Sequence, residues 1–351
     1  MADSHCTVPA TIKLFLDSDA LIHNWTFLDS LSGKASAGAA VKANGYGVGA
    51  ISVVQHLYKA GCRDFYVANW VEAAEIEAVL ANDANISVLN GVRAEDMSFA
   101  VKSRAKPVLN TVQQILRWVP AGMPCDLMIN SGMNRLGINI EDIAHISDSI
   151  LNIDIVMSHL ACADEDVIQN QEQLEAFKAA LQQVSGKRAS LANSAGIALG
   201  SDYHFDTTRP GLSLYGGSQR DLLSSNIMQV VFPQSQILQV RDLVAGDRLG
   251  YNAQYIAAEV KRVAILAMGY ADGYLRGFSG TGCFASDGRD LPVLGRVSMD
   301  LIAVDLSAAM ELSEGDWVDC KFDLPQATRQ SGMSQYELLT CLGSRSDRIW
   351  R

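Results

Sequence analysis

Residues 39–50 read Ala39-Ala40-Val41-Lys42-Ala43-Asn44-Gly45-Tyr46-Gly47-Val48-Gly49-Ala50. The small apolar residues before Lys42 predict a short buried strand, and the three glycines after it predict a turn. A lysine at the end of such a strand has apolar neighbours, which disfavour its ammonium form and lower its pKa. Such an amine can act as a nucleophile or as a base. The alternative interpretation is a lysine that reaches the surface past a flexible turn.

On both sides of this stretch, short apolar runs alternate with amphipathic segments as far as about residue 235. The amphipathic segments predict helices, including one over 71–80 with Glu72 on its solvent side and one over 140–149. This alternation is typical of a parallel sheet with crossover helices. About eight such units fit, which favours a (β/α)8 barrel over 12–235, although periodicity alone does not exclude an open sheet.

Four polar residues each follow the carboxyl end of an expected strand. They are Lys42, Arg135, His159 and Ser194. Enzymes with this barrel fold place their active sites at that end of the strands. We therefore expect these four side chains to lie close together.

From about Gln236 the helical patterns give way to short β-rich runs separated by turn clusters such as Ala245-Gly246-Asp247. This texture predicts a second domain, rich in β-strands, over 236–351. A final helix is expected over 334–342.

The composition of the 351 residues narrows the class of protein. With 48% hydrophobic and 19% charged residues, the chain fits an ordinary enzyme with large cores. Its formal net charge of −11 argues against nonspecific nucleic-acid binding. It has no apolar run long enough to span a membrane, and residues 1–6 do not begin a secretory signal. The seven scattered cysteines show no metal-binding spacing, so we expect reduced thiols, a cytoplasmic protein and no metal.

Residues 39–50 also resemble the cofactor-lysine motif of alanine racemases, and further motifs of that family follow in order across nearly the whole chain. They are Ser131-Gly132-Met133-Asn134-Arg135-Leu136-Gly137, Thr208-Arg209-Pro210-Gly211-Leu212-Ser213-Leu214-Tyr215-Gly216, Leu249-Gly250-Tyr251 and Gly295-Arg296-Val297-Ser298-Met299-Asp300. Each string alone is a moderate signal, but their occurrence in order argues against chance. The resemblance implies a barrel followed by a β domain, pyridoxal 5'-phosphate as cofactor, and interconversion of L- and D-alanine. It also implies a homodimer with shared active sites.

The resemblance implies a role for each matching residue. Lys42 bonds the cofactor and is the base on one face of the substrate, and Tyr251 from the partner subunit is the base on the other. Arg209 faces the pyridine nitrogen, and a guanidinium does not give up its proton, so that nitrogen stays unprotonated. His159, in the cofactor site, orients or polarises Tyr251. The expected phosphate contacts are Tyr46, Ser194, Gly211 and Leu212, and the expected contacts to the substrate carboxylate are Arg135 and the Met299 amide.

Two places depart from the family pattern. Met128 stands where many members carry a carbamylated lysine, and Asn130 replaces an aspartate, so Arg135 needs another partner. Ser344 stands where some members have a tyrosine that shapes the pocket, and this smaller polar group would admit serine beside alanine.

Three alternatives to alanine racemisation therefore stay open. One is a racemase of serine or of another small amino acid. The second is a decarboxylase of the related barrel-plus-β-domain group, which has a cysteine in place of the tyrosine base. The third is a noncatalytic cofactor-binding protein, a class that lacks the β domain. The presence of Tyr251 and of the β domain ranks the last two lower.

Overall fold

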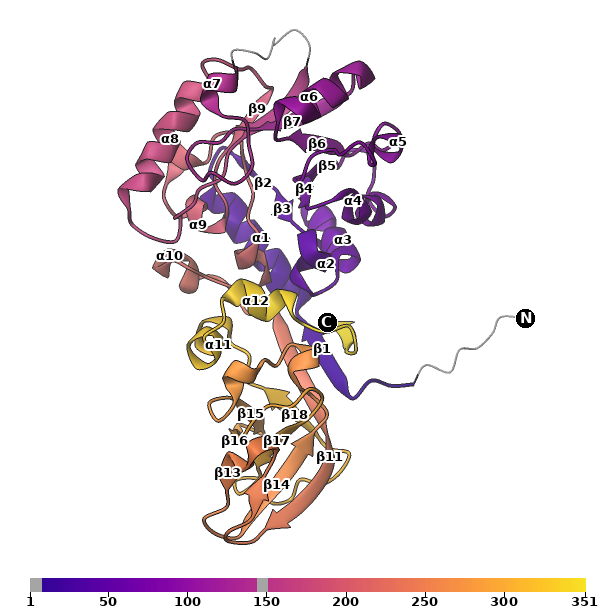
Figure 1. Cartoon of the computed structure of the whole chain (residues 1–351), viewed down its shortest axis with the longest axis vertical. Coiled ribbons are helices and arrows are strands. Elements are labelled where there is room, and N and C mark those ends of the chain that lie inside the picture. The colour runs from indigo at the N-terminus through magenta and orange to yellow at the C-terminus, as the bar shows by residue number, and fades with distance from the viewer. Residues whose placement is uncertain (1–7, 144–150) are drawn as a thin grey trace, which may run out of the picture. The chain divides into compact units, whose positions relative to one another are not determined.

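The computed structural model describes residues 8–143 and 151–351. The chain divides into two compact units, one made of Asp19–Met228 and one made of Met1–Ser18 together with Gln229–Arg351 (Figure 1). Of the helix expected over 140–149, the structure describes the start, α7 (Ile140–Ile143). The rest of that helix and the N-terminal residues on which the absence of a signal was judged lie outside the described residues.

The unit Asp19–Met228 contains a seven-stranded parallel sheet whose strands lie in sequence order. The strands are β3 (Ala39–Ala40), β4 (Asp64–Val67), β5 (Asn85–Val88), β6 (Lys106–Leu109), β7 (Pro124–Met128), β8 (Asn152–Met157) and β9 (Arg188–Ser190). A separate parallel pair joins β10 (Thr207–Thr208) to β2 (Ser36–Ala37), and β2 runs into β3. Beyond β10, Arg209 bridges to Asn193, which follows β9. Thus β10 closes the sheet as an eighth strand, which confirms the expected TIM-like barrel.

Helices surround this sheet because their apolar residues recur on one face. In α3 (Ala50–Ala60) the buried positions are Ala50, Val53, Val54 and Leu57, which is the helical period. The other helices and 3₁₀ turns of this unit are α1 (Ser18–Leu31), α2 (Lys42–Tyr46), α4 (Trp70–Glu77), α5 (Met97–Ala100), α6 (Val112–Trp118), η1 (Val119–Ala121), α8 (Ile168–Ala180), α9 (Ser194–Ile197), η2 (Ser201–Tyr203), η3 (Leu212–Tyr215) and α10 (Asp221–Ser224). No helix in the described part of the chain is long and apolar enough to cross a membrane.

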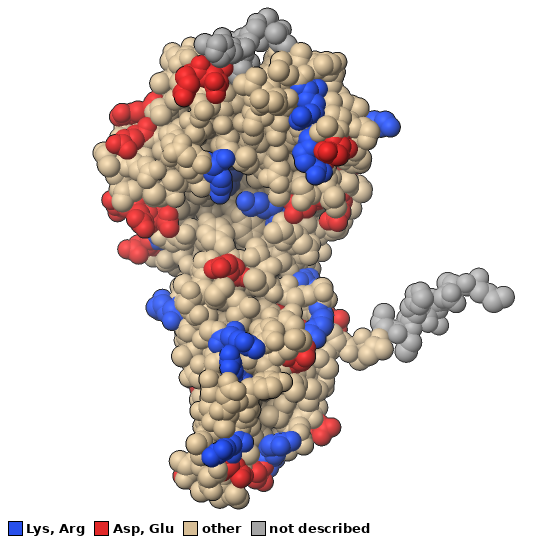
Figure 2. Space-filling model, in the orientation of Figure 1, with Lys and Arg blue, Asp and Glu red and all other residues tan. Residues whose placement is uncertain are grey.

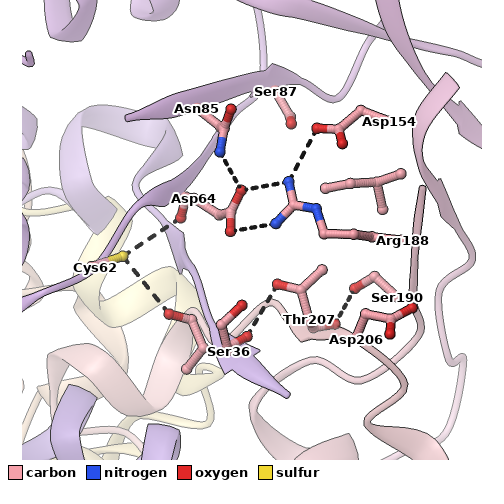
Figure 3. A network of polar contacts seen from close by, with 12 residues as sticks. Ser36, Cys62, Asp64, Asn85, Ser87, Asp154, Arg188, Ser190, Asp206 and Thr207 are labelled. Carbon is pink, nitrogen blue, oxygen red and sulfur yellow. Dashed lines mark hydrogen bonds and ion pairs between the residues drawn. The ribbon is translucent and has the colours of Figure 1, made fainter. Parts of the chain in front are cut away.

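Charged side chains fill the N-terminal end of the barrel interior. Arg188 donates two hydrogen bonds to Asp64, at 2.7 and 2.9 Å, and one to Asp154 at 3.1 Å (Figure 3). Lys106 pairs with Asp154 and lies 3.7 Å from Asp126, whose carboxyl pKa is raised by burial. These five residues come from five different strands, and they hold the strands together at this end. In this fold, active sites lie at the opposite end of the barrel, where the strands have their carboxyl ends.

The strand β1 (Ile12–Leu16) departs from the expected barrel over 12–235. It pairs antiparallel with β11 (Val231–Leu243) and parallel with β19 (Asp347–Trp350), so it belongs to the sheet of the other unit. Burial alternates along β1, which is the pattern of a strand with one covered face. A strand inside a parallel barrel would be covered on both faces.

The second unit is built on antiparallel pairing, as the β-rich sequence texture predicts. The strands β14, β17, β16, β15, β18 and β11 pair in that order, and β11 also pairs with β14, so they close into a barrel. The remaining bounds are β12 (Arg248–Leu249), η4 (Tyr251–Ala253), β13 (Tyr255–Ile256), β14 (Lys261–Leu266), η5 (Tyr270–Asp272), η6 (Arg276–Phe278), β15 (Cys283–Ser286), β16 (Arg289–Leu294), β17 (Ile302–Asp305), β18 (Trp317–Cys320), α11 (Leu324–Ser331) and α12 (Gln335–Thr340). The helix α12 fulfils the prediction for 334–342, and Ser334 caps it by accepting the N–H of Glu337.

Candidate active site

Lys42 stands two residues after the end of the β3 strand and opens a turn with an uncommon backbone. The four residues after it, Ala43 to Tyr46, have φ angles of 53°, 54°, 62° and 54°. This left-handed conformation costs roughly 1–2 kcal/mol for each residue that is not glycine. Such strain persists only where the surroundings fix it, and it concentrates at functional sites. The expected strand, lysine and glycine-rich turn are therefore present, and the turn is held against its own preference.

The surroundings of Lys42 favour its neutral amine. Burial is the main cause of its lowered pKa, and the cations Arg135 and Arg209 lower it further, whereas Glu72 raises it. Figure 2 shows basic side chains in a hollow on the visible face of this unit. A neutral lysine amine can attack a carbonyl carbon or accept a proton.

Arg209 is a buried cation whose hydrogen-bond acceptors are neutral. Its guanidinium donates to the Ser190 hydroxyl, to the Ser158 carbonyl, and to the Leu191 carbonyl at 3.3 Å. Burial lowers the pKa of Arg209. Because it stays charged, the guanidinium is suited to donate to an electron-rich ring nitrogen without protonating it.

Hydroxyls and backbone amides converge beside this arginine. The Ser194 hydroxyl accepts the N–H of Gly211 at 2.9 Å and the N–H of Ser213 at 3.2 Å. A Cβ added to Gly211 would lie 2.3 Å from Oη of Tyr46, so only glycine allows the backbone to come this close to the phenol. The Tyr46 ring stacks on Tyr215 with centroids 4.7 Å apart. Groups of this kind bind phosphate.

Leu212 and His159 complete the expected cofactor residues. Leu212 is buried at the start of η3, next to Gly211. His159 follows the carboxyl end of β8, and burial together with Arg209, Arg135 and Lys42 lowers its pKa to about 3. The imidazole is therefore neutral at ordinary pH, and it can hydrogen-bond without adding charge.

The loop that carries Arg135 is shaped by Asn130. The Asn130 side chain accepts the N–H groups of Gly132 at 3.2 Å and of Asn134 at 3.0 Å, and it donates to the side chains of Asn134 and Asn139. Arg135 itself is exposed. Asn130, which stands where the family pattern has an aspartate, thus stabilises the loop backbone through neutral hydrogen bonds.

Tyr251 and Met299 belong to the other unit. Tyr251 stands at the tip of the β12–β13 hairpin between Gly250, with φ of 72°, and Asn252, with φ of 60°, and the residue is 67% exposed. Met299 is also exposed, and its carbonyl accepts the N–H of Ala271 at 3.0 Å. The barrel unit thus brings together the cofactor residues and Arg135, but not these two.

Two sets of contacts next to expected site residues, one in each unit, could not be predicted from the sequence. Glu72 was expected on a solvent face, but its carboxylate accepts the N–H of Ala43 at 2.8 Å, next to Lys42. The spacing of Asn69 and Glu72 is that of a capping box, which is a signal that the glutamate binds backbone. In the other unit, Arg345 binds Asp272 and Asp300, and so fixes the segment next to Met299. Nothing in the sequence alone pairs these three residues.

The barrel site has parts that fit pyridoxal phosphate. Lys42 offers an amine with a lowered pKa to the aldehyde, and Arg209 offers a buried cation to the ring nitrogen. Ser194, with the Gly211 backbone and Tyr46, offers hydroxyl and amide groups to the phosphate. The protein's part in such chemistry is to hold and orient the cofactor.

Comparison with known proteins agrees with this arrangement. Residues 16–219 match the family described as "Alanine racemase, N-terminal domain", and residues 230–350 match "Alanine racemase, C-terminal domain". The chain is 37% identical over 364 residues to an alanine racemase of Rickettsia akari (strain Hartford), with 99% of each chain covered. It is 35% identical to a biosynthetic alanine racemase of Agrobacterium fabrum, with 97% of this chain and 93% of the relative covered.

A solved structure has the same fold over the full length. It is the crystal structure of alanine racemase from Bartonella henselae with covalently bound pyridoxal phosphate. The TM-score is 0.92 at 33% identity, and the match covers 98% of this chain and 100% of the other.

Proposed function

Since the chain belongs to the alanine racemase family, it is a pyridoxal-phosphate-dependent enzyme that racemises alanine, and we propose that Lys42 and Tyr251 are its two bases. Racemisation removes the Cα proton on one face of the substrate and returns a proton on the other, so it needs an acid/base group on each face. The observation that carries the proposal is the lowered pKa of Lys42, caused by burial and by Arg135. It favours the neutral amine, which is the form that accepts a proton.

The cofactor, when bound, would withdraw electrons from Cα and so acidify its proton. Nζ of Lys42 then accepts or returns that proton on its own face, and Oη of Tyr251 does so on the other. Arg209 keeps its proton and so leaves the ring nitrogen unprotonated. His159, neutral because of its lowered pKa, orients the Tyr251 phenol without adding charge.

The remaining residues bind and orient. Ser194, Tyr46 and the backbone of Gly211 and Leu212 hold the phosphate by hydroxyl and N–H groups. Arg135 and the Met299 amide hold the carboxylate of the small amino-acid substrate. These contacts to the carboxylate position the substrate so that its Cα lies between the two bases.

We also propose a homodimer in which each active site takes Tyr251 from the partner subunit. The exposure of Tyr251 and of Met299 supports this, because both side chains lie open on their own unit. A two-fold axis would complete two identical sites at once. The six cysteines of the described chain are all free, which supports the proposed cytoplasmic location.

The test of the two bases is proton exchange at Cα of each alanine enantiomer in deuterated water. A base on one face exchanges the proton of one enantiomer only. Tyr251→Phe should therefore lose racemisation and the exchange of one enantiomer, while it keeps the exchange of the other through Lys42. Tyr255→Phe, in the same hairpin, is the matched control and should keep both. Exchange of both enantiomers at wild-type rates by Tyr251→Phe would show that Tyr251 is not a base.

A further inference from the structure

Glu72 accepts hydrogen bonds from two backbone N–H groups, one in the turn after Lys42 and one at the end of the neighbouring strand. Its carboxylate accepts the N–H of Ala43 at 2.8 Å through Oε1 and the N–H of Ala68 at 2.7 Å through Oε2. Ala43 follows Lys42, and Ala68 follows the β4 strand. One side chain of α4 thus joins the lysine turn to the end of the neighbouring strand.

The reason for this double contact lies in the β3–β4 ladder. The N–H of Val41 donates to the carbonyl of Tyr66 at 2.9 Å, as in a regular parallel pair. The next bond of such a ladder would run from the N–H of Ala68 to the carbonyl of Val41. That carbonyl instead accepts the N–H of Gly45 at 2.8 Å, because the chain has entered the left-handed turn. The N–H of Ala68 therefore needs another acceptor, and Glu72 supplies it.

Resting on the function proposed above, we propose that Glu72 is a positioning residue for the racemase reaction. Its carboxylate fastens the strained turn that carries Lys42, and it places one negative charge beside that lysine. A carboxylate suits this task because both of its oxygens are acceptors. A carboxamide has a single acceptor oxygen, and its NH2 group would face a backbone N–H.

The charge of Glu72 opposes the other groups that act on Lys42. Burial, Arg135 and Arg209 lower the pKa of Lys42, and Glu72 raises it. A further titratable group near Lys42 is His159, which is neutral because its pKa is about 3. Loss of the Glu72 charge therefore favours the neutral amine still more, while loss of its hydrogen bonds leaves that amine less well placed. The two effects have opposite signs and can be separated.

The test compares Glu72→Gln with wild type and with Glu75→Gln, a matched control at an exposed position on α4. The apoenzyme of each is mixed with pyridoxal phosphate, and the rate of covalent uptake is followed by absorbance over a range of pH. Only the neutral amine of Lys42 reacts, so the midpoint of the profile reports its pKa. For Glu72→Gln we expect the midpoint to fall by about one pH unit. We expect the plateau at high pH to fall about tenfold, because the amine is misplaced. Glu75→Gln should match wild type.

Several outcomes decide the proposal. An unchanged midpoint for Glu72→Gln would overturn it, as would an unchanged plateau. A Lys42→Ala apoenzyme that still takes up the cofactor covalently would instead refute the lysine assignment, which keeps the two failures distinct. Should Glu72→Gln not fold, amide exchange in wild type decides. The N–H groups of Ala43 and Ala68 should both be protected from exchange at pH 7, because both donate to the Glu72 carboxylate. Rapid exchange of both at pH 7 would overturn the proposal.

Discussion

The contact between Gly211 and Tyr46 offers a quantitative test of the phosphate site. In Gly211→Ala the new Cβ would lie 2.3 Å from Oη of Tyr46 and 3.0 Å from Cζ. Real Cβ atoms do not approach other atoms closer than 3.0 Å, so the phenol must move by at least about 0.7 Å. The Tyr46 ring cannot slide freely, because it stacks on Tyr215 at 4.7 Å. Overpacking of this kind costs about 1–3 kcal/mol.

That cost should appear in the affinity for the cofactor, because both residues of the clash belong to the proposed phosphate site. A loss of about 1–3 kcal/mol corresponds to a rise of about 5- to 150-fold in the Kd for pyridoxal phosphate. The assay is titration of each apoenzyme with the cofactor. Thermal unfolding of the same apoenzymes shows how much strain the unloaded fold already carries.

A double-mutant cycle with Tyr46→Phe isolates the clash. Removal of the hydroxyl eliminates the 2.3 Å contact and leaves the milder one at 3.0 Å. In the Tyr46→Phe background, Gly211→Ala should therefore cost less than about 1 kcal/mol, and the coupling between the two changes is the rest of the cost of about 1–3 kcal/mol expected in wild type. Additive effects would refute the reasoning, because they would show that Gly211 is not required by its contact with the phenol.

Three further predictions concern the barrel. Arg188→Met leaves the buried Asp64 carboxylate without its cation, so the free energy of unfolding in urea should fall. We expect a fall of about 2–4 kcal/mol, a value reduced because Arg188 is partly exposed. A change below about 0.5 kcal/mol would contradict the role of this network. His159 has a folded-state pKa of about 3 against an ordinary value of 6.5, so unfolding takes up a proton below pH 6.5 and stability falls with the pH. Between pH 6.5 and 4.5 wild type should lose about 1–2 kcal/mol more than His159→Gln, and equal losses in urea titrations would contradict this. After borohydride reduction of the loaded enzyme, wild type should carry the cofactor mass at Lys42 and Lys42→Ala should carry none; label at another residue in both proteins would displace the assignment.

The sequence predicted what depends on local pattern. Apolar runs alternating with amphipathic segments predicted the barrel, and the run before Lys42 predicted a strand end with a turn behind it. The same patterns misplaced Ile12–Leu16, because a short strand does not reveal which sheet it joins. Its partners, β11 and β19, lie more than two hundred residues away along the chain. The alternating burial of β1 follows from that pairing.

Contacts that depend on the tertiary structure could not be predicted from the sequence. Glu72 was expected on a solvent face because helical spacing places it there. Its carboxylate instead accepts two backbone N–H groups at the end of the β3–β4 ladder. The left-handed turn after Lys42 includes Ala43, a residue that does not favour this conformation by itself. The bidentate contact of Arg345 with Asp272 joins segments far apart in the chain, and no local pattern signals it.

The central claim is that Lys42 of one subunit works with Tyr251 of its partner, and mixing two inactive variants tests it most directly. Lys42→Ala and Tyr251→Phe are combined under conditions in which mass spectrometry shows exchange of subunits. In a mixed dimer one site carries both lesions, and the other has an intact Lys42 and an intact Tyr251. About half of the dimers are mixed after random exchange, so racemase activity should recover to about a quarter of the wild-type value. If each site were built from one chain, every site would keep one lesion, and no activity would return despite exchange.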